Sequence, residues 1–186
     1  MRKLVESTFV SLDGVISDPQ KFGPPYWNDE HANYNRDLLF AANAMLLGRV
    51  TYEGFSKAWP PRAGKGDDFA DRFNELPKYV ASNTLQSVEW NSTLLKGDVA
   101  AEIAKLKQQP GQNIVKYGTG ELDRTLLMPN KLVDEFHFWL FPVAVGRGDR
   151  LLDGIDVTHL KLAGTTTFTT GIVVLRYEPK DEKDGR

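Results

Sequence analysis

The sequence predicts an α/β domain built on a doubly wound, mostly parallel β-sheet with an antiparallel C-terminal edge and helices on both faces. Short apolar segments alternate with amphipathic ones up to about residue 128, which is typical of parallel strands joined by helices. From residue 133 onward only strand-like segments follow, which indicates that the last strands pair antiparallel. The length of 186 residues suits one domain, expected over residues 1–178, with an unstructured tail at 179–186.

Each element has a local signal in the sequence. Strands are expected where apolar residues run together between turn residues, at 4–12, 44–47, 78–82, 113–117, 133–145, 159–166 and 171–177. Helices are expected where apolar residues recur at the helical period, at 29–43, 49–57, 68–76, 121–128 and between Asp98 and Pro110. The segment 133–145 is apolar on both sides, which predicts a central strand covered by helices.

Composition limits the function classes. The chain has no cysteine, which excludes disulfides, thiolate nucleophiles and cysteine-ligated metals. The net charge is −2, from 23 basic and 25 acidic residues. The chain thus lacks the excess of basic residues that is typical of nucleic-acid-binding proteins. There is neither an apolar run of about 20 residues nor a signal-peptide core, so we expect a cytoplasmic protein without a membrane partner. His31, His137 and His159 lack metal-ligand spacing. We therefore expect no metal, an exposed His31 and a hydrogen-bonded His137.

The first candidate anion site is a strand-to-helix turn at residues 48–51. Gly48 allows close approach of a phosphate, and Arg49 can pair with it. Backbone N–H groups of Val50 and Thr51 open the following helix, whose dipole favours an anion, and the Thr51 hydroxyl can donate as well. The alternative is an ordinary turn with Thr51 as the helix cap.

A second turn of this kind lies between the strand that ends at Tyr117 and the helix that begins at Glu121. Gly118, Thr119 and Gly120 make it sharp, but neither a complete dinucleotide-binding glycine motif nor a P-loop lysine is present. Two such turns at the carboxyl ends of strands predict a shared crevice for a nucleotide with several phosphates. Two purely structural turns are the alternative.

Three further segments border this predicted site. Ser82 and Asn83 end a strand and suit either a ribose or a turn. Asp13-Gly14 is a turn pair that could also act as a lid. Trp27 suits a flat heterocycle, and the carboxyls that follow it are candidate proton donors or merely complement the helix dipole. The candidate donors are Asp29 and Glu30, and the candidate substrate contacts are Trp27, Phe40 and Pro142.

Taken in order, these motifs resemble the dihydrofolate reductase superfamily. They are most similar to the C-terminal reductase domain of the bifunctional riboflavin-biosynthesis deaminase–reductase and its stand-alone bacterial relatives. The resemblance extends over residues 2–178 and depends on the segments 11–16, 46–53, 80–83, 117–122, 133–135 and 142–148.

The resemblance implies an extended NADP(H) molecule and a homodimer that acts on a small-molecule substrate. Phosphate would be held by Gly48, Arg49, Val50 and Thr51, and the adenosine end by Ser82 and Asn83. The pyrophosphate would lie against Tyr117, Gly118, Thr119, Gly120, Glu121 and Leu122. The nicotinamide would lie against Leu12, Asp13, Gly14 and Ile16.

The implied activity is hydride transfer from NADPH to a small nitrogen heterocycle or a ribosylaminopyrimidine, as in 5-amino-6-(5-phosphoribosylamino)uracil reductases. Dihydrofolate or pteridine reduction is an alternative. The dihydrofolate-reducing members carry an acid inside the first helix, where Ala32 and Asn33 stand here. A non-catalytic NADP(H)-binding protein is the other alternative.

Overall fold

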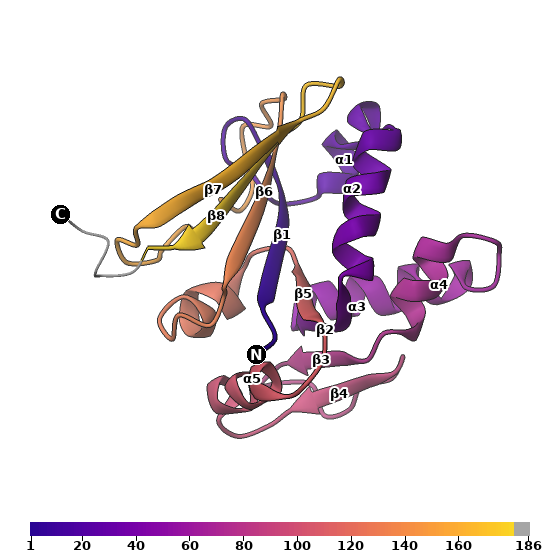
Figure 1. Ribbon diagram of the computed structural model, residues 1–186, viewed down its shortest axis with the longest axis vertical. Helices are drawn as coiled ribbons and strands as arrows, with labels where there is room; N and C mark the ends of the chain where they lie inside the picture. Colours follow the sequence, from indigo (N-terminus) through magenta and orange to yellow (C-terminus); the bar gives the residue numbers. More distant parts are fainter. Residues whose placement is uncertain (181–186) are drawn as a thin grey trace. The chain divides into compact units, whose positions relative to one another are not determined.

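Strand β1 (Leu4–Ser11) is buried along nearly its whole length, with only Phe9 partly exposed. The computed structural model describes residues 1–180. Figure 1 draws β1 in indigo. The chain divides into two units, each made of two segments. The first unit comprises residues 1–4 and 34–117, and the second comprises residues 5–33 and those from 118 onward. The expectation of one domain over residues 1–178 stays a prediction.

In the first unit all strands are parallel, in the order β4-β3-β2-β5. They are β2 (Ala42–Gly48), β3 (Lys78–Ala81), β4 (Ser92–Leu95) and β5 (Asn113–Tyr117). The connecting helices are α3 (Arg49–Ala58), η2 (Pro60–Arg62), α4 (Asp68–Glu75) and α5 (Val99–Gln108). Met45 and Leu47 of β2 are fully buried in a core shared with Phe73 of α4. Gly48 pairs with Ala81, so β2 and β3 end at the same edge.

The second unit carries the antiparallel edge. Its strand order is β1-β6-β8-β7, in which β1 and β6 are parallel while β8 runs antiparallel to both β6 and β7. The remaining elements are α1 (Pro19–Phe22), η1 (Pro24–Tyr26), the start of α2 (Asp29–Phe40), the π-helical turn η3 (Asp123–Leu127), β6 (Glu135–Phe141), β7 (Leu160–Thr167) and β8 (Val173–Pro179). The predicted fold class, a mostly parallel α/β sheet with an antiparallel C-terminal edge, is confirmed.

Several predicted boundaries are wrong for physical reasons. The strand expected over 133–145 covers only Glu135–Phe141, because Pro142 has no N–H for the ladder. The short strand β4 was not expected, since its sequence, Ser92 to Leu95, lacks a long apolar run. In the predicted tail, Pro179 belongs to β8, and residues 181–186 lie outside the described residues. Among residues 1–180, no helix combines the length and apolar character that crossing a membrane requires.

Lys78 is an unusual core residue of the first unit. It opens β3 and has no exposed surface. Its ammonium donates to the carbonyls of Asn74 (2.9 Å) and Leu76 (2.6 Å) and lies 4.1 Å from the ring centroid of Trp90. Burial lowers the pKa of Lys78 from 10.5 to about 8.

The lowered pKa of Lys78 predicts a dependence of stability on alkaline pH. Between pH 8 and 10.5 the unfolded chain binds the lysine proton and the folded chain releases it. The free energy of unfolding should therefore rise through this window, by up to about 3 kcal/mol. Lys78→Met should abolish that rise in urea titrations at stepped pH, while Lys96→Met at an exposed position should keep it. Parallel pH profiles for Lys78→Met and the wild type would contradict the assignment.

Candidate functional site

A first candidate anion site, in the first unit, is the start of α3, directly after β2. Gly48 is the N-cap residue, with extended backbone angles (φ −75°, ψ 162°) and no side-chain hydrogen bond to the helix. The N–H groups of the first helical turn, at Val50 and Thr51, are therefore not capped by a side chain. Such a terminus favours an anion through both its free donors and the helix dipole.

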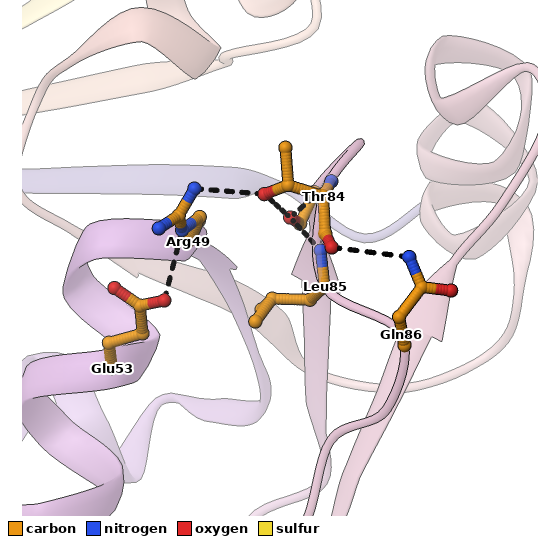
Figure 2. Close-up of polar contacts among 6 residues, drawn as sticks. Arg49, Glu53, Thr84, Leu85 and Gln86 are labelled. Carbon is orange, nitrogen blue, oxygen red and sulfur yellow. Dashed lines mark hydrogen bonds and ion pairs between the residues drawn. The ribbon is translucent and has the colours of Figure 1, made fainter.

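Arg49 lies at this helix start with its guanidinium half-exposed. Figure 2 shows its Nη1 donating to the Thr84 hydroxyl (2.9 Å) and its Nε donating to the Glu53 carboxylate (2.9 Å). The Ser82 hydroxyl accepts the backbone N–H groups of Thr84 (3.2 Å) and Leu85 (3.1 Å), and so shapes the loop that presents Thr84. A guanidinium, a neighbouring hydroxyl and a free helix N-terminus together suit a phosphate monoester.

Thr84 is the residue that sequence reasoning missed here. The predicted pair was Ser82 and Asn83, and Asn83 is exposed. The local signal for Thr84 is weak, because only the register of β2 and β3 brings the loop after β3 to the start of α3.

A second candidate anion site, in the second unit, is the turn after β5. Gly118 has a positive φ of 76°, and its N–H donates to the Ser7 carbonyl (2.8 Å). The Thr119 hydroxyl donates to Glu6 (2.6 Å), and the Gly120 N–H donates to the Asp123 carboxylate (2.7 Å).

These bonds leave three backbone donors at the turn. Within residues 1–180, the N–H groups of Thr119, Glu121 and Leu122 have no hydrogen-bond acceptor. A Cβ atom at Gly120 would meet nothing within 4 Å, so the space beside the turn is open. Three free N–H groups beside open space fit one phosphate of a pyrophosphate.

Tyr117 takes no part in this turn through its side chain. Its ring packs against Phe55 (6.2 Å between centroids) and Phe73 (5.5 Å) in the first unit. Its hydroxyl is buried and has no partner in the part of the chain that the structure describes, and burial raises its pKa. Any cofactor contact predicted for Tyr117 is thus left to its backbone.

The predicted turn at residues 12–16 is fastened to the loop after β6. The Asp13 carboxylate accepts the Ser11 hydroxyl (2.7 Å) and the N–H groups of Val145 (2.9 Å) and Gly146 (2.7 Å), and these bonds lower its pKa. Gly14 supplies the left-handed backbone (φ 86°). The Ile16 N–H donates to the Asp149 carbonyl (2.9 Å). These bonds hold the turn against the loop after β6 in the structure, and its role as a lid stays a prediction.

Apolar groups gather where β1 and β6 end. Leu12 follows β1 and is 64% exposed, and its N–H donates to the Val143 carbonyl (2.8 Å). Pro142 follows β6, and its carbonyl accepts the Tyr26 hydroxyl (3.2 Å). Trp27 is 47% exposed. We call Leu12, Tyr26, Trp27 and Pro142 the apolar rim. Phe40 belongs to the first unit, where it packs against the Arg36 guanidinium (4.1 Å), and its substrate contact stays a prediction.

The two predicted proton donors differ in their surroundings. The Glu30 carboxylate accepts the backbone N–H of Thr169 (2.8 Å), the Thr169 hydroxyl and the Asn28 amide (2.9 Å). These bonds lower the pKa of Glu30, so it is ionised and can only accept hydrogen bonds at neutral pH. Asp29 is exposed in the first turn of α2.

The expectation for His31 is wrong, because this histidine is buried. Its ring stacks on Trp27 (5.6 Å, 18°) and meets Trp139 edge-on (5.2 Å). Its Nε2 atom is buried without a hydrogen-bond partner among the described residues, and burial lowers its pKa to about 4. The charged neighbours of His31 on α2 are visible in the sequence, but the aromatic residues that pack against its ring are not. His137 is hydrogen-bonded to Glu135 (2.8 Å), as expected.

Solved structures define the class of protein to which this fold belongs. A putative riboflavin biosynthesis protein from Shewanella sp. PV-4 superimposes with a TM-score of 0.76 at 20% identity, over 96% of this chain and 99% of that one. Enterococcus faecalis dihydrofolate reductase, complexed with NADP(H) and RAB-propyl, gives a TM-score of 0.63 at 16% identity, over 96% and 97%. The fold is dihydrofolate-reductase-like.

Sequence comparison then assigns the family. The model of the RibD C-terminal domain matches residues 2–174. The uncharacterized protein YyaP of Bacillus subtilis (strain 168) is 31% identical over 188 residues, which cover 95% of this chain and 94% of YyaP. The chain therefore belongs to the RibD C-terminal domain family.

The burial of His31 predicts a loss of stability in acid. Between pH 6.5 and 4 the unfolded chain takes up the histidine proton before the folded chain does. The free energy of unfolding should fall as the pH drops through this window, by up to about 3 kcal/mol. His31→Phe should flatten this part of the pH profile in denaturant titrations, and His159→Phe, at an exposed position, should not. An equal acid loss in both variants would show that His31 does not titrate in this way.

Proposed function

We propose that this protein is an NADPH-dependent reductase that transfers a hydride to a small nitrogen heterocycle or a ribosylaminopyrimidine, as in riboflavin biosynthesis. The observation that carries the proposal is the Arg49 guanidinium beside the Thr84 hydroxyl at an uncapped helix start. A 2′-phosphate is the group that this set suits, and it distinguishes NADPH from NADH. Membership of a reductase-like family supports the same conclusion.

The residues present fit the rest of the cofactor as well. The free N–H groups of Thr119, Glu121 and Leu122 would hold the pyrophosphate. The apolar rim would cover a nicotinamide and keep water from it, since Leu12 and Trp27 expose apolar surface. NADPH, when bound, supplies the hydride, and the protein supplies alignment and a dry surface.

The proton for the reduced nitrogen has no assigned carboxylic acid in this proposal. Glu30 is held ionised by Thr169 and Asn28, Asp29 is exposed, and Ala32 and Asn33 stand nearest the position of the acid in the dihydrofolate-reducing members. We infer that solvent delivers the proton after hydride transfer. The lack of an acid at that position disfavours the dihydrofolate alternative. A non-catalytic NADP(H)-binding protein would use the same cofactor contacts without turnover. The cytoplasmic location and the homodimer stay predictions.

The test is a binding and turnover assay on the purified chain. Tryptophan fluorescence should be quenched by NADPH, and nicotinamide absorbance should then fall when 5-amino-6-(5-phosphoribosylamino)uracil is added. Oxidation with dihydrofolate alone would favour the dihydrofolate alternative. Binding without oxidation of NADPH by pterins, folates or aminopyrimidines would favour the binding protein. An absence of NADPH binding would refute the proposal.

Arg49→Ala should weaken NADPH binding more than NADH binding, by about 1–3 kcal/mol, because only NADPH carries the 2′-phosphate. Arg49→Lys should lie between the wild type and Arg49→Ala, since lysine keeps the charge but loses the planar fork. Lys57→Ala removes a charge from the other end of α3 and is the matched control. Titration calorimetry with both nucleotides measures the difference. An equal loss for NADPH and NADH would refute the 2′-phosphate role.

A further inference from the structure

The side chain of Thr119 does not face outward from its turn. Its hydroxyl donates to Glu6 Oε1 (2.6 Å) and lies 2.8 Å from the Thr8 hydroxyl. Glu6 and Thr8 belong to β1 and are 0% and 2% exposed. The Thr8 hydroxyl also donates to Glu6 Oε1 (3.4 Å), so both threonines contact the same carboxyl oxygen.

This arrangement leaves the Thr119 hydroxyl without a proton for any ligand. The hydroxyl instead binds the turn to the buried Glu6 carboxyl of β1. Glycines flank Thr119 on both sides, and glycine is the residue with the greatest backbone freedom. Thr119 is therefore the only residue of the three whose side chain can hold the turn.

Backbone bonds complete the anchoring on either side. The Gly118 N–H donates to Ser7 of β1 (2.8 Å), and the Gly120 N–H donates to Asp123 (2.7 Å). The N–H groups of Thr119, Glu121 and Leu122 are the donors left over in the described part of this turn. Their directions are fixed by a turn that is bound at three consecutive residues.

We propose that Thr119 is a positioning residue for the cofactor pyrophosphate, because its hydroxyl bond to Glu6 fixes the turn whose N–H groups meet the phosphate. The inference rests on the proposed function. It assigns the Thr119 side chain to pre-organisation and its backbone to binding. Pre-organisation raises affinity by removing the ordering cost that a mobile turn would incur on binding.

The test compares Thr119→Val, which is isosteric but lacks the hydroxyl, with Thr119→Ser, which retains it. Thr119→Ala is the second variant without a hydroxyl, in case valine disturbs folding. Thr125→Val is the matched control, because within residues 1–180 the Thr125 hydroxyl bonds only to the Glu121 carbonyl (2.8 Å) and not to β1. Dissociation constants are measured for NADPH, for NADH and for adenosine 2′-monophosphate, which has a 2′-phosphate and no pyrophosphate. Thermal unfolding without ligand checks each fold.

Thr119→Val and Thr119→Ala should weaken NADPH and NADH alike, by about tenfold. Both should leave adenosine 2′-monophosphate unchanged, and Thr119→Ser should restore most of the dinucleotide affinity. Unchanged NADPH affinity in folded Thr119→Val and Thr119→Ala would overturn the positioning role while leaving the proposed function intact. An equal loss for adenosine 2′-monophosphate would also overturn it, because that loss indicates general damage. A wild-type protein that binds neither dinucleotide would overturn the proposed function itself.

Discussion

Parallel strand pairing is the constraint on which the candidate site depends. Strands that run in the same direction must end at the same edge, and their register decides which residues emerge together. In the first unit Gly48 pairs with Ala81, so Arg49 and Ser82 follow from neighbouring strand ends. In the second unit Ser11 pairs with Phe141, so Leu12 and Pro142 also follow from neighbouring strand ends. Each set of candidate residues is thus assembled by backbone hydrogen bonds before any side chain contributes.

A second consequence of this architecture is that several candidate carboxylates already accept hydrogen bonds from backbone N–H groups. Loops that leave strand ends carry N–H groups without ladder partners, and these groups need acceptors. Asp13 satisfies Val145 and Gly146, and Glu30 satisfies Thr169. A carboxylate that accepts several N–H bonds is stabilised in its ionised form and is a poor proton donor. Under the proposed function, the protein is therefore left to align the reactants and exclude water.

Most of the fold, and about half of the residues in the candidate sites, could be predicted from the sequence. Periodicity placed α3, α4 and β5 almost to the residue, because each is bounded by glycine, proline or a capping side chain. The Gly48 and Gly118 turns were visible because glycine marks a backbone requirement. Contacts between segments distant in sequence left no local signal. Examples of such contacts are those of Thr84 with Arg49, of Glu6 with Thr119, and of His31 with its aromatic neighbours.

The ion pair between Arg49 and Glu53 bears on whether the first anion site is available. The two side chains are 51% and 41% exposed and lie four residues apart on α3. Exposed pairs of this kind contribute only about 0.3–0.5 kcal/mol, because water screens the charges and both side chains lose freedom. A phosphate carries more charge than a carboxylate and would also receive the Thr84 hydroxyl and the helix N–H groups. Glu53 therefore orients the guanidinium without competing strongly for it, and the weakness of the pair is what allows Arg49 to serve a ligand.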